Sequence, residues 1–303
     1  MVRRLGSWLI ALALLSAAVG VQGASVASAQ TGPIGYTVGA RLNEADCHFY
    51  AVDLPTGEAT QVSTDPVPCA DGLTFAPDGT LYAVQRVGAG PTFDANLVTI
   101  DPTDGTQQIV GALPPVQYLA LGMTFDAAGE LWLYGAAPGN ADCLAFASLT
   151  CLWRVDPADA SAEIVGGAPA SLFVFGLAGS CDGEVVAITV FATGNGGTAL
   201  QRVDTGNGAL DQIVILPDVP VPEGLDYSAD GRLWSIGLPG DGGQALVFLI
   251  DPASGDATQT GITVGGDPLE ATLAGLAVDP ITCPEPEPPP TPEPIVLEPT
   301  FTG

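Results

Sequence analysis

Basic residues are scarce in this sequence, and lysine is absent altogether. Seven arginines and one histidine stand against 34 acidic residues among 303, which gives a formal net charge of −27. So strong a negative field repels phosphate backbones and argues against binding to nucleic acid. The absence of lysine also excludes Schiff-base chemistry and a lysine base. An acidic surface of this kind is typical of a soluble exported protein.

Long hydrophobic runs are absent after the first 30 residues. Arg3 and Arg4 precede an apolar run from Trp8 to about Val21, and a small-residue cleavage site follows at 27–29. We therefore predict a signal peptide over residues 1–29, because the run is too short for a good membrane span. The mature chain, with five basic residues and net charge −29, should be secreted and not inserted in a membrane.

Zinc-binding motifs are also missing, because no two of the six cysteines form a Cys-x-x-Cys pair. Six cysteines in an exported chain indicate disulfides, for which fifteen pairings are possible.

What the sequence does contain is a phrase that recurs about every 50 residues. It begins as Gly-Leu-Thr-Phe at Gly72 and returns, with changes, at Gly122, Gly176, Gly224 and Gly275. In three copies an Asp-Gly pair follows, at 78–79, 182–183 and 230–231, and such pairs tolerate the positive φ of a tight turn. Each complete phrase therefore predicts a β-hairpin.

A second phrase alternates with the first: an apolar strand that ends at an aspartate before a turn. These aspartates are Asp53, Asp101, Asp156, Asp204 and Asp251, and their side chains can cap the turns. Two hairpins in a repeat of this length are the signature of a four-stranded propeller blade.

The two ends of the mature chain each supply part of a blade. The chain begins with the later half of a repeat, from about Tyr36 to Val62, and ends with an opening strand at 275–278. We therefore predict an all-β fold over residues 30–283, a five-bladed β-propeller whose last blade is closed by N-terminal strands. A larger ring with a degenerate blade is the alternative, but the spacing of the phrases leaves no room for it.

The predicted topology orders several side chains. Tyr82, Trp132 and Trp234 occupy one equivalent place on the second strands, and we expect them to fill the space between blades. His48 begins a strand far from the axis, so we do not expect it to be catalytic.

The topology also constrains the disulfides. The connections after second and fourth strands share one face of the ring, and the hairpin turns share the other. Cys143 and Cys151 lie in one such connection, and Cys47 and Cys69 meet on the same face at a blade boundary, so we predict these two pairs. Cys181 and Cys283 remain as a third pair by elimination.

Ligands of propellers usually bind at the axial mouth where the innermost strands begin. The residue before each repeat glycine is therefore a candidate: Asp71, Leu121, Phe175, Glu223 or Ala274. Two carboxylates beside Leu121 and Phe175 would suit a ligand with polar and apolar parts.

The segment Pro222-Glu223-Gly224-Leu225 and the Asp-Gly turns resemble the repeats of SMP-30/gluconolactonase and NHL-type propellers. In the lactonases such mouth positions hold a catalytic divalent metal, so the resemblance would make Asp71 and Glu223 ligands of an ion such as Ca²⁺. Those lactonases have six blades, however, and two oxygens fall short of the six to eight that calcium prefers.

From residue 284 the chain is rich in proline and glutamate, and we expect residues 284–303 to be a disordered tail. We expect the propeller to be a monomeric extracellular binding or scaffold module, without a cofactor, for an unknown ligand or protein. A divalent-metal-dependent, lactonase-like hydrolase is the alternative.

Overall fold

The computed structural model describes residues 32–42, 45–88, 94–114, 121–136, 143, 150–169, 171–191, 197–239 and 243–280. The predicted signal peptide and tail lie outside these residues. The described part of the chain forms 22 β-strands, and it contains no helix long and apolar enough to cross a bilayer.

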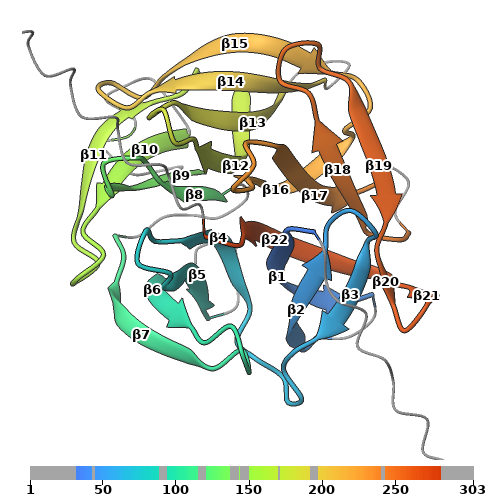
Figure 1. Ribbon diagram of the computed structural model, residues 1–303. Helices are drawn as coiled ribbons and strands as arrows, with labels where there is room; N and C mark the ends of the chain where they lie inside the picture. Colours follow the sequence, from blue (N-terminus) through green and yellow to red (C-terminus); the bar gives the residue numbers. More distant parts are fainter. Residues whose placement is uncertain are drawn as a thin grey trace, which may run out of the picture. The chain divides into compact units, whose positions relative to one another are not determined.

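Four of the five sheets are blades of four consecutive antiparallel strands (Figure 1). The first blade consists of β4 (Ala70–Phe75), β5 (Leu81–Val87), β6 (Asp94–Ile100) and β7 (Gln107–Ala112). The second consists of β8 (Leu121–Phe125), β9 (Leu131–Ala136), β10 (Thr150–Val155) and β11 (Ala162–Gly167). The third consists of β12 (Leu172–Gly179), β13 (Val185–Phe191), β14 (Thr198–Asp204) and β15 (Ala209–Leu216). The fourth consists of β16 (Val221–Tyr227), β17 (Leu233–Leu238), β18 (Leu246–Ile250) and β19 (Ala257–Gly261).

The fifth sheet, the closing blade, joins the two ends of the described chain. Its innermost strand, β22 (Ala271–Val278), pairs with β1 (Ile34–Arg41), and β2 (Cys47–Asp53) and β3 (Glu58–Gln61) follow outward. Two short strands, β20 (Thr263–Val264) and β21 (Asp267–Pro268), extend this sheet beyond β3. The predicted five-bladed propeller closed by N-terminal strands is confirmed, and the two outer strands are an addition that the sequence did not indicate.

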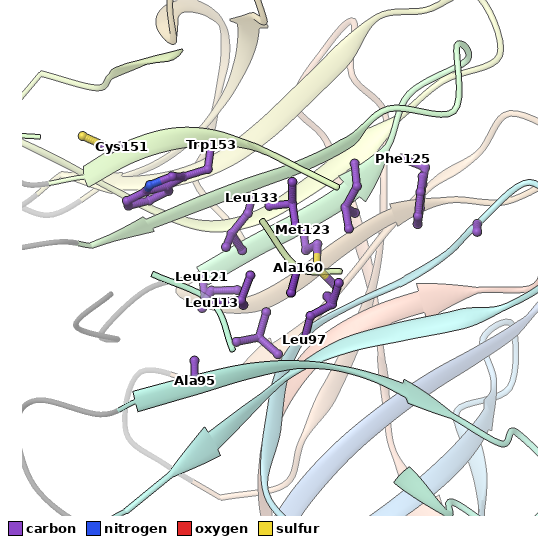
Figure 2. Close-up of a cluster of buried hydrophobic side chains, with 14 of the residues drawn as sticks. Ala95, Leu97, Leu113, Leu121, Met123, Phe125, Leu133, Cys151, Trp153 and Ala160 are labelled. Atoms are coloured by element: carbon purple, nitrogen blue, oxygen red, sulfur yellow. The ribbon is translucent and has the colours of Figure 1, made fainter. Parts of the chain in front are cut away.

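The core consists of five apolar clusters, one at each boundary between neighbouring blades. Figure 2 shows the cluster between the first and second blades, where Leu97 and Leu113 lie beside Leu121, Met123 and Leu133. The aromatic side chains on the second strands take part in these clusters, as predicted: Tyr82, Trp132 and Trp234. The hydrophobic stabilisation of the ring therefore comes from contacts between blades.

The repeat glycines lie where the innermost strands β4, β8, β12, β16 and β22 meet around the axis (Figure 1). A Cβ atom added to Gly122 would lie 2.6 Å from the backbone carbon of Gly176. One added to Gly224 would lie 2.4 Å from the amide nitrogen of Leu276. At Gly122, Gly176, Gly224 and Gly275 a blade thus approaches the next backbone to backbone, whereas at Gly72 the nearest atom is Cδ2 of Leu121.

Two predicted disulfides are confirmed. Cys47 pairs with Cys69 and Cys143 pairs with Cys151, with Cα–Cα distances of 5.3 and 5.8 Å. Cys181 is also disulfide-bonded, but its predicted partner Cys283 lies outside the described residues. These bridges indicate an oxidising compartment outside the cytoplasm.

On the outer side of the closing blade, Glu58 connects β3 to the segment that contains β20. Its carboxylate accepts hydrogen bonds from the Thr263 hydroxyl at 2.7 Å and from the Gly265 amide at 3.0 Å. We expect Glu58→Ala to lower the free energy of unfolding by about 1 kcal/mol, measured by urea denaturation, because both bonds are exposed to water.

A double-mutant cycle with Thr263→Val isolates this contact. The two substitutions together should cost less than the sum of their separate effects, whereas Glu270→Ala, an exposed glutamate near the start of β22, should change little. Additive effects of Glu58→Ala and Thr263→Val would show that the contact contributes nothing.

Candidate functional site

Two of the mouth residues, Glu223 and Phe175, lie at β-bulges just before their repeat glycines. Pro222 pairs with Gly237 and Gly224 pairs with Ile236, so Glu223 is an extra residue without a partner in the ladder. Phe175 is the extra residue at the same place in β12. The pairing of β4 with β5 also shifts, between Asp71 and Thr74. Bulges of this kind turn a side chain out of the regular alternation of a strand and are frequent beside active sites.

Asp71, at the mouth on β4, is held by Arg86 of β5. The Nη2 atom of Arg86 donates to Oδ1 of Asp71 at 2.6 Å, and Nε donates to Oδ2. Asp71 is buried, whereas the side chain of Arg86 is 42% exposed. The hydrogen bonds to Asp71 raise the pKa of Arg86, so the guanidinium stays charged and keeps its remaining N–H groups available.

Glu223 reaches the same place from β16, which contacts β4 across the axis. Its pKa is raised to about 7, first because burial penalises the charged carboxylate and then because the charge of Asp71 is near. Arg86 acts in the opposite direction but does not cancel these effects. Among the described residues the Glu223 side chain makes no hydrogen bond or ion pair. The structure thus brings together an ion pair and a carboxyl group that has no partner.

The other predicted mouth residues contribute differently. Leu121 is 6% exposed and lies in the apolar cluster between the first two blades, so it offers little surface to a ligand (Figure 2). Phe175 is half-buried and packs against the cluster between the third and fourth blades. Ala274 is half-buried on β22, and its carbonyl accepts a hydrogen bond from the Thr37 hydroxyl.

His48 lies on β2, the third strand from the axis in the closing blade. Its Nδ1 atom lies 3.2 Å from the side-chain nitrogen Nε2 of Gln61, on the neighbouring strand. None of Asp71, Arg86 and Glu223 interacts with it in the described part of the protein.

A divalent metal fits these residues poorly. Within the described ranges, no three His, Cys, Asp or Glu side chains are close enough together to hold a metal ion. Both oxygens of Asp71 already accept hydrogen bonds from Arg86, which supplies the positive charge that a metal would bring. Asp71 and Glu223 would therefore have to displace Arg86 before they could share an ion.

Arg86 is the functional candidate that sequence reasoning missed. The predicted hairpin could have identified it. With a turn at 77–80, Ala70 pairs with Gln85, and this register places Arg86 beside the mouth. Arg86 is also one of only five basic residues after the predicted signal peptide.

Comparisons with known proteins add a fold-level likeness only. No family model and no curated protein matches the sequence. Among solved structures, TolB from Acinetobacter baumannii aligns with a TM-score of 0.46 and 13% identity over 82% of this chain, which spans about half (54%) of TolB. A gluconolactonase from Xanthomonas campestris aligns with a TM-score of 0.43 and 15% identity over 80% of this chain and 79% of its own. The periplasmic gluconolactonase of Pseudomonas aeruginosa aligns with a TM-score of 0.42 and 19% identity over 75% and 82%.

Proposed function

We propose that the protein is a secreted, monomeric binding module whose ligand occupies the axial mouth at Asp71, Arg86, Glu223 and Phe175. The observation that carries this proposal is Glu223, a half-buried carboxyl that has no partner among the described residues and whose pKa is raised to about 7. Burying a polar group without a hydrogen bond is costly, so a carboxyl left in this state is one that a ligand would stabilise.

The chemistry of the mouth suits a ligand that carries both hydroxyl groups and an apolar part. Glu223 in its neutral form can donate a hydrogen bond, and in its charged form it accepts several. Arg86 uses two of its five N–H groups on Asp71, which leaves donors for a ligand oxygen. Phe175 offers an apolar surface at the same end of the inner strands.

A thermal-shift screen of small polyols, hydroxy acids and amines, followed by calorimetric titration of the hits, tests this assignment. Glu223→Gln should weaken binding of a hit by about tenfold or more, because a hydrogen bond to a charged or polar ligand in a buried site is lost or misdirected. Glu163→Gln, on outer strand β11 with a side chain 71% exposed, is the matched control and should bind normally. A hit that binds the Glu223 variant as well as the wild type would show that the mouth is not its site.

The same carboxyl favours a second candidate, a hydrolase in which Glu223 transfers a proton. A general acid or base works best when its pKa is close to the working pH, and about 7 satisfies this condition. In the metal-dependent form of this hypothesis a divalent ion such as Ca²⁺ would bind Asp71 and Glu223.

The metal-dependent form can be tested without a substrate. If Ca²⁺ is part of the site, a chelator should lower the melting temperature and added Ca²⁺ should restore it. An unchanged melting temperature would argue against the metal. Turnover of lactone or ester substrates by wild type, but not by Glu223→Gln, would support the hydrolase over the binding module.

A further inference from the structure

The opposite end of the axis, where the inner strands finish, contains a cavity of about 280 Å³. All five inner strands or the turns after them contribute to its wall, including Thr74 and Phe75, Thr124 and Phe125, and Asp226. None of Asp71, Arg86 and Glu223 lines it. Glu223 and Asp226 stand near opposite ends of β16, so this second mouth is separate from the site proposed above.

Asp226 is a buried carboxyl in the wall of this cavity. One of its oxygens accepts a hydrogen bond from the Tyr227 amide and the other from the Val278 amide, each at 2.8 Å. Each oxygen keeps a second lone pair for another donor. Burial raises the pKa of Asp226 to about 7 in spite of the two amides, and no cationic side chain of the described residues pairs with it.

Thr74 provides an independent observation. Its side chain lines the same cavity and is 3% exposed, yet its hydroxyl makes no hydrogen bond among the described residues. Thr124, at the same position of the next repeat, accepts a hydrogen bond from the Gly179 amide at 2.9 Å and donates one to the Phe125 carbonyl at 3.2 Å. The cavity is therefore lined by a largely buried threonine whose hydroxyl has no hydrogen-bond partner among the described residues.

The charged side chains of the wall are all acidic. Asp126 of the second blade lines it as well as Asp226 of the fourth, and none of the described arginines does. The Asp126 carboxylate accepts bonds from the Ala128 and Glu130 amides and from the Trp132 indole. A ligand of this cavity should therefore bring positive charge.

We propose that the cavity binds a small primary ammonium compound, with the ammonium group at Asp226 and Thr74 and its hydrocarbon part against Phe75 and Phe125. An ammonium group has three N–H donors and a positive charge, which match the free lone pairs of Asp226 and the hydroxyl oxygen of Thr74. The two rings supply an apolar and cation-attracting surface. The volume, equal to that of about nine water molecules, accommodates an alkyl chain of several carbons and is too large for a bare metal ion.

Calorimetric titration of the purified protein with butylammonium chloride tests this proposal, with 1-butanol and sodium chloride as ligand controls. The measurement is made above about pH 7, where Asp226 is ionised while the ammonium group stays charged. We expect saturable one-to-one binding of butylammonium and none of the two controls.

Thr74→Val is the decisive variant, because it removes a hydroxyl that bonds no other group of the described protein and so should leave folding intact. It should weaken butylammonium binding by about tenfold, and Thr64→Val, an exposed threonine before β4, should not. Absence of saturable binding, equal binding of 1-butanol, or unchanged affinity in Thr74→Val would overturn the proposal. Loss of binding in Glu223→Gln but not in Thr74→Val would place the ammonium group at the other mouth and overturn it equally.

Discussion

Replacing Gly122 by alanine is expected to lower the free energy of unfolding by more than about 3 kcal/mol, or to prevent the folded protein from accumulating. The new methyl group would lie 2.6 Å from the carbonyl carbon of Gly176, 2.6 Å from the backbone nitrogen of Leu177 and 2.9 Å from the Cα atom of Gly176. All three are backbone atoms, so no change of rotamer relieves the clash. The third blade cannot move away from the new methyl group, because it is in close contact with the fourth blade at Gly176. A Cβ atom added to Gly176 would lie 2.7 Å from the backbone nitrogen of Leu225. The ring can therefore yield only by opening between blades.

Gly197→Ala is the matched control for this prediction. A Cβ at Gly197 meets nothing within 4 Å, and its φ lies outside the left-handed region. Its effect on the free energy of unfolding should stay within about 1 kcal/mol and can be slightly stabilising, because alanine restricts the unfolded chain. Urea denaturation of both variants measures the difference. A Gly122 variant as stable as the Gly197 variant would mean that the blades are not in contact at their glycines.

The same glycines explain why the fold could be predicted from the sequence. Five recurrences of one phrase predict five inner strands, and a chain that starts with the later part of a repeat has to close on its own end. The confirmed pairing of β1 with β22 follows from that count. The disulfides Cys47–Cys69 and Cys143–Cys151 follow from knowing which connections share a face.

The two short outer strands of the closing blade, β20 and β21, could not be predicted in this way. β20 and β21 have two residues each, too few to show an alternating pattern, and β20 is held by a parallel pairing with Glu58 and Ala59. That pairing joins segments some 205 residues apart, as the bond between Thr263 and Glu58 shows. Local propensity carries no information about such a contact.

The candidate sites were predictable in part. The repeats placed Asp71 and Glu223 at one mouth, but the bulge that frees Glu223 from its ladder leaves no mark in the sequence. Asp226 had a signal that went unused: the position two residues after the repeat glycine is Thr, Thr, Ala, Asp and Ala in the five copies. A single carboxyl in an otherwise small or hydroxyl-bearing ring indicates a role at the second mouth.

Asp226 should make the protein less stable as the pH rises from about 4 to about 7. Its pKa is raised in the folded state, so the folded protein binds this proton more tightly than the unfolded chain does. The stabilisation is complete below the ordinary pKa of aspartate and is lost as the pH rises through the folded value of about 7. A shift of this size corresponds to about 4 kcal/mol from Asp226 alone. Glu223 contributes with the same sign over the same range.

Urea denaturation at several pH values across this range measures the slope, and Asp226→Asn should reduce it by about one proton, or 1.4 kcal/mol per pH unit at most. Asparagine can accept only one of the two amide bonds, so the variant should be less stable at low pH, but this loss does not change the slope. Asp211→Asn, with a side chain 85% exposed, is the control and should keep the wild-type slope.

Six exposed aspartates with lowered pKa values act in the opposite direction, but only below about pH 4, outside the measured range: Asp78, Asp101, Asp159, Asp182, Asp230 and Asp251. A wild-type slope in Asp226→Asn would mean that the carboxyl is solvated in the folded protein, because only burial without a cation makes it hold a proton so tightly.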